Sequence, residues 1–277
     1  MIALLALASS AVWGTSDFAA GLIAKRRPAA AVVGWSQAVS LVVMSVLVAW
    51  PGRAWPGGGW PVWAVVAGFS GGSALVCFYG ALSTGTMGVV APIASLGVVV
   101  PVLLGVLGGE QPGLVTWAGM IVAVLGVLLA SGPELDGSVG LRPVVLACCA
   151  GAGFGVTLYS LDRGARSSVL HTLWGMRATS VTCFVLAALL LRRLGGMQRS
   201  DLPALAFVGV ADLCANALFA VASSRGYVSV ASVLGSLYPV VTAGWAYAVL
   251  HERLRGVQNA GIALTMAGVA LIAGGSA

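Results

Sequence analysis

The chain has 277 residues, of which 59% are hydrophobic and only 8% are charged, and its formal net charge is +6. A soluble domain carries roughly 25% charged residues, so this composition predicts an integral membrane protein. The lysines and arginines lie almost entirely in the loops between apolar stretches, a pattern that argues against nucleic-acid binding. The five cysteines lie in apolar runs without a CxxC spacing, so we expect no metal site and no disulfide framework.

Ten apolar segments follow one another along the chain. Each has about the 20 residues that a membrane-spanning helix needs. Turn-forming sequences such as KRRP, PGRAWPGGG and RRLGGMQRSD separate them, and no loop is long enough for a soluble domain. The predicted segments are 2–23, 29–50, 61–83, 86–108, 113–131, 141–161, 169–191, 202–224, 228–250 and 256–275.

The chain matches itself when it is shifted by 142 residues, so that Glu110 falls on Glu252 and Gly126 on Gly268. The offset drifts slightly along the halves. It is 141 near their start, where WGTSDF resembles FGVTLY, and 140 near their middle, where Gln37 can be set against Arg177. Such self-similarity indicates an internal duplication. The two repeats cover residues 1–131 and 141–275, and residues 132–140 connect them.

Each repeat contains five predicted segments, an odd number, so the second repeat must be inverted relative to the first. The predicted fold class is therefore an all-α integral membrane protein with ten transmembrane helices in two five-helix inverted-topology repeats. In membrane proteins of this kind the substrate path usually lies between the repeats.

Glycines and prolines add detail to this prediction. Glycines spaced by four or seven residues, such as Gly119 and Gly126, lie on one helix face and allow close helix packing. We favour packing within the bundle, with a homodimer interface as the alternative. Pro92, Pro101 and Pro239 lie inside segments 86–108 and 228–250, where they kink a helix as either a flexible gate or a fixed bend.

Positive charge is distributed unequally between the two sides of the predicted bundle. Four arginines lie in loops on the side of the N-terminus and nine lysines or arginines on the other side. The positive-inside rule therefore predicts that both termini lie outside the cytoplasm.

Three ionisable residues, Asp17, Arg177 and Asp212, lie within apolar segments, where an unpaired charge is unfavourable. Either aspartate can serve as a proton or cation carrier, or as a permanent structural partner of Arg177. Arg177 in turn either satisfies an aspartate or holds an anionic substrate group. Asn216 lies four residues after Asp212, on the same helix face, which makes segment 202–224 the best candidate cavity wall.

Aromatic side chains complete the candidate substrate site, because they offer an apolar ring with a polar handle. For each of them ordinary core packing is the alternative. Trp50, Trp55, Trp60 and Trp63 cluster at a helix end and indicate an interfacial belt instead. The candidate substrate-binding residues are Trp13, Asp17, Trp35, Tyr79, Tyr159, Trp174, Arg177, Asp212, Asn216 and Tyr238.

Glu110 and Glu252 end the fourth and ninth segments, and we expect each to cap the N-terminus of the next helix. His171 and His251 lie near segment ends and are interpreted as interfacial. We find no nucleophile constellation, no ATP-binding motif and no sign of a cofactor, so the sequence predicts no enzyme.

The chain resembles the drug/metabolite transporter superfamily, and within it the EamA-type proteins. WGTSDF in the first segment carries the resemblance, as do VVAPIASLGVVVPVLLGVLGGEQP in the first half and SVLGSLYPVVTAGWAYAVLHERL with QNAGIALTMAGVALI in the second. The family's Gly-Glu-Arg pattern is reduced here to Gly109-Glu110-Gln111 and His251-Glu252-Arg253.

The resemblance implies a secondary transporter of the bacterial inner membrane, often an exporter of amino acids, other metabolites or drugs. It also implies cytoplasmic termini, whereas the charge count places them outside, and we follow the count. We expect a small-molecule substrate, a surrounding lipid bilayer and proton or ion coupling. The alternative is a membrane-embedded scaffold or sensor subunit that does not transport.

Overall fold

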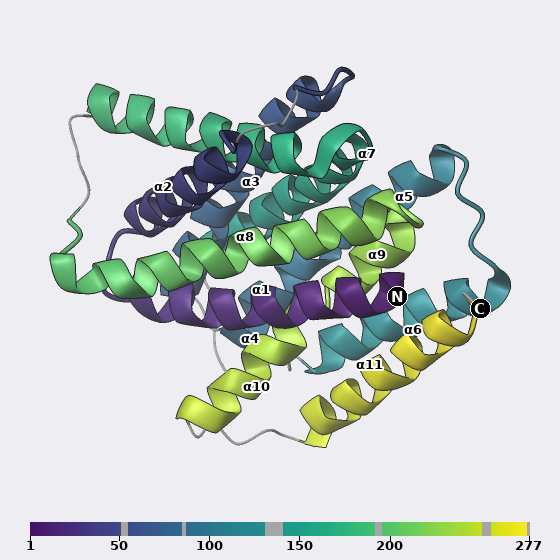
Figure 1. The fold of residues 1–277 in the computed structure, drawn as a ribbon. Coiled ribbons are helices and arrows are strands. Elements are labelled where there is room, and N and C mark those ends of the chain that lie inside the picture. The colour runs from purple at the N-terminus through teal and green to yellow at the C-terminus, as the bar shows by residue number, and fades with distance from the viewer. Residues whose placement is uncertain (51–54, 85–86, 131–140, 192–195, 251–255, 276–277) are drawn as a thin grey trace.

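The computed structural model describes residues 1–50, 55–84, 87–130, 141–191, 196–250 and 256–275. These residues form helices joined by short turns, with no strand among them (Figure 1). Six helices in the described part are long and apolar enough to cross a membrane. The chain is therefore a multi-pass membrane protein.

The described residues of the first half form six α-helices and one short 3₁₀ helix. They are α1 (Ile2–Ala24), α2 (Ala29–Val48), α3 (Trp60–Thr84), α4 (Met87–Ser95), η1 (Leu96–Val98), α5 (Val99–Leu107) and α6 (Leu114–Ala130). The second half consists of α7 (Leu141–Leu191), η2 (Arg199–Asp201), α8 (Leu202–Ser224), α9 (Val228–Gly235), α10 (Tyr238–Leu250) and α11 (Gly256–Gly275). Helices α1, α2, α3, α6, α8 and α11 agree with predicted segments to within two residues at each end.

Two segments predicted as single helices are broken in the structure. Segment 86–108 divides into α4 and α5 around η1, and segment 228–250 divides into α9 and α10. Pro101 and Pro239 lie in the first turns of α5 and α10, where a helix needs no amide hydrogen. These two prolines therefore begin a second helix after each break, whereas the sequence predicted a kink within one helix.

The start of the second half contains two helices, as the sequence predicted with segments 141–161 and 169–191. The range of α7 covers both helices, which meet at a kink where Ser168 has non-helical geometry (φ −164°, ψ 113°). The Ser168 hydroxyl lies 2.9 Å from Nδ1 of His171 and accepts a hydrogen bond from the His171 amide at 3.4 Å. An N-cap serine of this kind lets the helix restart after one extended residue.

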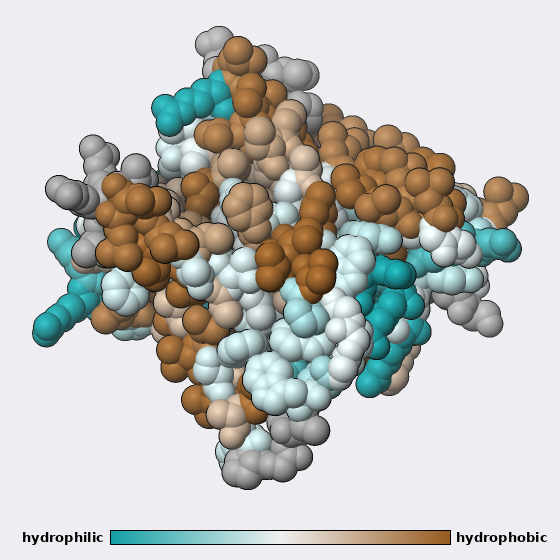
Figure 2. All heavy atoms as spheres, turned by 90° about the horizontal axis from the view of Figure 1, so that it is seen from above, coloured by the Kyte–Doolittle hydropathy of each residue, from teal (hydrophilic) through white to brown (hydrophobic). Residues whose placement is uncertain are grey.

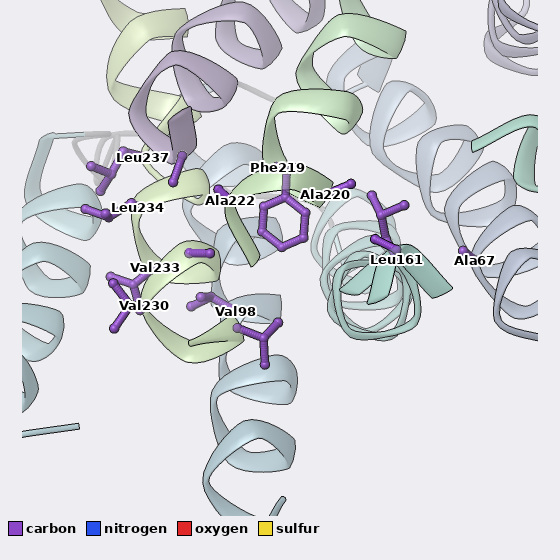
Figure 3. Close-up of a cluster of buried hydrophobic side chains, with 14 of the residues drawn as sticks. Ala67, Val98, Leu161, Phe219, Ala220, Ala222, Val230, Val233, Leu234 and Leu237 are labelled. Carbon is purple, nitrogen blue, oxygen red and sulfur yellow. The ribbon is translucent and has the colours of Figure 1, made fainter. Parts of the chain in front are cut away.

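The apolar core lies where the broken helices meet the continuous ones. Helix α9 is buried along its whole length. Its Val230, Val233 and Leu234 pack in one cluster with Phe219 of α8 and Leu161 of α7 (Figure 3).

Many large apolar side chains are exposed on the outside, among them Leu107, Leu114 and Leu190. The face in Figure 2 carries brown hydrophobic patches at its left, top and upper right, with a pale area across the centre and a teal hydrophilic group to the right of it. An apolar exterior is what lipid contact requires.

Helices α6 and α11 lie side by side and pack through their glycines (Figure 1). A side chain on Gly119 would meet the Ile272 amide at 2.8 Å, and one on Gly268 would meet the backbone of Ala123. Glycine thus lets the two backbones approach closely enough for dispersion contacts to hold them together in lipid. The prediction that these glycines pack within the bundle is confirmed.

Contacts between the halves recur at positions 141 residues apart. Trp13 of α1 packs on Phe219 of α8 with ring centroids 5.7 Å apart. The residues 141 positions away from each, Phe154 of α7 and Phe78 of α3, pack at 5.6 Å. Both contacts join the two halves. In the first contact an early helix of the first half packs on the second half, and in the other contact an early helix of the second half packs on the first half.

Candidate functional site

A central cavity of about 70 Å³ lies between the two halves. This is far smaller than the roughly 300–1,000 Å³ of a typical ligand pocket, so admitting a solute requires the walls to separate. Residues from both halves line it: Trp13, Asp17, Gly71, Leu75, Ala94, Ser95 and Val98 from the first, and Phe154, Thr157, Leu158, Met176, Arg177, Asp212, Asn216, Gly235, Ser236 and Tyr238 from the second.

The breaks in the two split helices meet at this cavity. Ser95 ends α4 directly before η1, and Ser236 follows the end of α9. These serines are 141 residues apart in the sequence, and both line the cavity. Helix breaks at membrane depth occur where backbone lines a cavity or is covered by protein, so the broken segments mark the same place in each half.

Arg177 is the centre of a buried polar cluster. Its side chain is 0% exposed, and Nη2 donates a 2.7 Å hydrogen bond to Oδ2 of Asp212. Its Nη1 donates to Oε1 of Gln37 at 2.5 Å. A buried guanidinium is stable only when it is paired and hydrogen-bonded, and these two partners provide that pairing.

Two further side chains donate hydrogen bonds to the carboxylate of Asp212. Its Oδ1 accepts a hydrogen bond from Nε1 of Trp13 at 3.3 Å and another from Nδ2 of Asn216 at 3.1 Å. Asn216 lies one turn after Asp212 on α8, as the sequence indicated, and also donates to the Asp212 carbonyl oxygen at 2.7 Å. The structure therefore pairs Asp212 with Arg177.

Gln37 is a member of this cluster that sequence reasoning did not select. It is 2% exposed on α2 and accepts hydrogen bonds from Arg177 and from the Ser180 hydroxyl, the latter at 3.1 Å. The signal that could have found it was present, because Gln37 falls on Arg177 in the comparison of the two halves. Residues at equivalent positions of two repeats touch each other when they lie close to the axis that relates the repeats.

Asp17 lies on the same cavity but outside the Arg177 cluster. It is 8% exposed, and its Oδ1 accepts a 3.1 Å hydrogen bond from the hydroxyl of Tyr79. Tyr79 is 2% exposed and does not line the cavity itself. Tyr238 lines the cavity, and among the described residues its buried hydroxyl has no hydrogen-bond partner.

Three predicted site residues lie away from the central cavity. Trp35 on α2 is 47% exposed on the outer surface. Trp174 donates from Nε1 to the Ser45 hydroxyl at 3.1 Å and packs against Trp55 at 5.5 Å. Tyr159 follows Leu158 on α7 and faces a different hollow. Tyr159 points away from the cavity that Leu158 lines, because adjacent residues on a helix point about 100° apart.

That second hollow is larger and lies near the end of the bundle where Met1 is found. It measures about 1450 Å³ and is lined by Tyr159, Asp162, Arg163 and Arg225, among others. Asp162 is 1% exposed and pairs with Arg166 at 3.0 Å. We call this hollow the vestibule. It borders the central cavity along α7, where Leu158 lines one and Tyr159 the other.

Glu110 has a different partner from the one predicted. Its carboxylate accepts hydrogen bonds from the amides of Val228 at 2.6 Å and Ser229 at 3.1 Å, and so caps the N-terminus of α9. The sequence suggested the next helix in the chain, but the first turn of α9 in the other half lies closer. A carboxylate satisfies unpaired amides at any helix start it reaches. Glu252 lies outside the described residues.

Among the described residues no group of three or more His, Cys, Asp or Glu side chains could hold a metal ion. The residues that line the central site make it an apolar, aromatic cavity with a few buried polar groups.

Comparison with known families accounts for this arrangement. The sequence model of the EamA-like transporter family matches residues 1–132 and again residues 141–274. The chain belongs to the EamA-like transporter family. An EamA-like protein is a membrane transporter of the drug/metabolite transporter type. The two matched stretches are the two halves whose contacts recur across the cavity.

Solved structures carry the same fold as this EamA-like protein. One crystal structure superposes with a TM-score of 0.79 at 19% sequence identity, covering 98% of this chain and 95% of that chain. At this identity the likeness shows the fold only. No curated protein matches the chain.

Proposed function

We propose that this EamA-like protein is a secondary transporter that moves a small metabolite, amino acid or drug-like solute by alternating access. The observation that carries the proposal is the central cavity, which lies between the halves beside two helix breaks at equivalent positions. Discontinuous helices at a repeat interface are the usual setting of a substrate site in secondary transporters. Export across a bacterial inner membrane fits the family.

The recurring contacts support an inverted relation between repeats 1–131 and 141–275. The first helix of each half packs on the third helix of the other half, as expected for two units exchanged by a two-fold axis. Rocking of one unit against the other would open the cavity to each side in turn.

The two ends of the molecule differ in access. The vestibule opens near Met1, whereas at the other end Arg27 bonds Asp201 at 2.9 Å and the Gly196 carbonyl at 3.2 Å. We infer that this form is hollowed at the Met1 end and held closed at the Arg27 end by these contacts of Arg27. If the charge count gives the orientation, the vestibule faces away from the cytoplasm.

Asp17 is the better candidate for coupling. Of the two aspartates in the cavity, Asp212 is held by Arg177, Trp13 and Asn216, so its charge is already compensated. Among the described residues the side chain of Asp17 accepts a hydrogen bond only from the neutral Tyr79 hydroxyl. A carboxylate at this depth without a cation is unfavourable, so exchange of a proton or cation at Asp17 would accompany each cycle.

Reconstitution into liposomes tests the proposal. Purified protein should catalyse counterflow of at least one solute from a mixture of amino acids, aromatic amines and cationic dyes, measured by mass spectrometry against protein-free liposomes. Asp17→Asn should lose the acceleration of counterflow by an imposed pH gradient, even where its counterflow without a gradient is weakened. A scaffold or sensor subunit would give no counterflow with any component, and that result would contradict transport.

A further inference from the structure

The charges that line the central cavity do not cancel. Asp17, Asp212 and Arg177 are the charged side chains among the described lining residues, two acidic groups and one basic. Arg177 is already engaged, with Asp212 on Nη2 and Gln37 on Nη1. The cavity is therefore left with one carboxylate, Asp17, that faces the space where a solute would bind.

The groups around Asp17 suit a positively charged partner. The hydroxyl of Tyr238 is buried, has no partner among the described residues, and can accept a hydrogen bond from a donor in the cavity. The rings of Trp13 and Phe154 line opposite halves of the same cavity. Aromatic faces attract cations, most strongly when the site excludes water.

An anionic solute would meet the reverse conditions. Nε of Arg177 is buried and has no hydrogen-bond partner among the described residues, but Asp212 already compensates the charge of the guanidinium in a 2.7 Å ion pair. An anion drawn to Arg177 would compete with that carboxylate, and breaking a buried ion pair is strongly unfavourable. Asp17 would also repel an anion from the remaining space.

We propose that the cavity binds an organic ammonium ion, with the amine nitrogen donating to Asp17 and Tyr238 and an apolar, preferably aromatic, body between Trp13 and Phe154. The apolar part of the wall, which includes Leu75, Val98 and Leu158, would cover that body. This inference rests on the proposed transport function and narrows its substrate class.

Three probes with the same phenyl ring and nearly the same chain separate the charge types. Phenethylamine is a cation, phenylalanine a zwitterion and 3-phenylpropionate an anion at neutral pH. Binding to purified wild-type protein is measured as a shift in thermal unfolding temperature, because a ligand that binds the native state stabilises it. We expect stabilisation to be largest with phenethylamine, smaller with phenylalanine and absent with 3-phenylpropionate.

Two variants locate the effect. Asp17→Asn keeps the shape of the side chain and removes its charge, so it should weaken phenethylamine binding by about tenfold or more. Asp201→Asn removes the same charge at the closed end, outside the cavity, and should leave that binding unchanged. Tyr238→Phe should weaken it by about threefold.

The outcomes separate this inference from the transport proposal. Stabilisation by 3-phenylpropionate equal to or above that by phenethylamine would overturn the inference. Equal weakening by Asp17→Asn and Asp201→Asn would also overturn it. Both measurements concern binding, so transport of an anion or zwitterion by the liposomes would leave the proposed function standing while this substrate class failed. The wild-type probe series decides the matter even where a variant does not fold.

Discussion

The two walls of the central cavity occupy equivalent positions in the two repeats but differ in chemistry. Asp17 on α1 corresponds to Leu158 on α7, Asp212 on α8 to Gly71 on α3, and Asn216 to Leu75, each 141 residues apart. Helices α1 and α8 thus form a polar wall, and α3 with the first part of α7 forms an apolar one. The duplicated scaffold supplies the shape of the cavity, and the unduplicated side chains supply its selectivity.

Breaking the charge pair of the polar wall should have the largest effect. Arg177→Met leaves Asp212 buried without its cation, and we expect a loss of about 3–5 kcal/mol in the free energy of unfolding. Thermal unfolding in detergent measures it. Arg27→Met is the control, because both partners of its ion pair, Arg27 and Asp201, are 21% exposed. Equal effects of the two substitutions would contradict a special role for the buried pair.

Exchanging residues between the polar wall and the apolar wall should lower the free energy of unfolding by unequal amounts. Leu75→Asn puts an amide into the apolar wall without a prepared partner, and we expect a loss of about 2–3 kcal/mol. Asn216→Leu removes one of several donors to Asp212, and we expect about 1 kcal/mol. The difference in unfolding temperature between the two variants checks this. Similar temperatures would mean that the walls are chemically alike.

The shared scaffold should respond alike in both halves. A side chain at Gly14 would lie 2.6 Å from the Tyr238 carbonyl oxygen, and one at its counterpart Gly155 would contact the Gly97 carbonyl oxygen. Gly14→Ala and Gly155→Ala should each lower stability by about 1–3 kcal/mol through overpacking.

Gly244 provides the matched control for these two substitutions, because it lies on α10 with no atom within 4 Å of an added side-chain carbon. Gly244→Ala should be neutral or stabilising, since alanine favours the helix. A loss confined to one of Gly14 and Gly155 would show that the halves pack differently.

The smallest effect is expected at the closed end. Arg27 and Asp201 are each 21% exposed, and such surface pairs contribute about 0–1 kcal/mol. Arg27→Gln should therefore change unfolding temperature little but make a cysteine placed near that end more reactive to a water-soluble thiol reagent. Unchanged reactivity would mean that this pair does not hold the end closed.

Much of the fold was predictable because helix length and apolarity are local properties. The limits of α1, α3 and α8 follow from runs of apolar residues bounded by turn sequences. The prolines of segments 86–108 and 228–250 predicted a kink in each. The division of each segment into two helices was not predicted, because an apolar run looks the same whether it forms one helix or two. The break between segments 141–161 and 169–191 was predicted, and it falls at Ser168, where two helices meet at a kink.

The candidate site was predictable in part. Asp17, Arg177 and Asp212 stood out because charge is rare at membrane depth, and all three line the cavity. Trp35 and Trp174 were selected as aromatics, but aromatic residues serve equally well at a lipid interface or in the core. Gln37 was not selected because it carries no charge, although its side chain accepts a hydrogen bond from Arg177.

The sequence by itself determined that this is a membrane protein built from two similar halves, because hydropathy and internal repetition are properties of the chain. Only the tertiary structure decided which aspartate Arg177 neutralises, since two carboxylates in different helices were equally available to it. It also decided that Glu110 caps α9 in the other half. Both outcomes depend on distances between residues remote in the chain, which follow from how the helices pack.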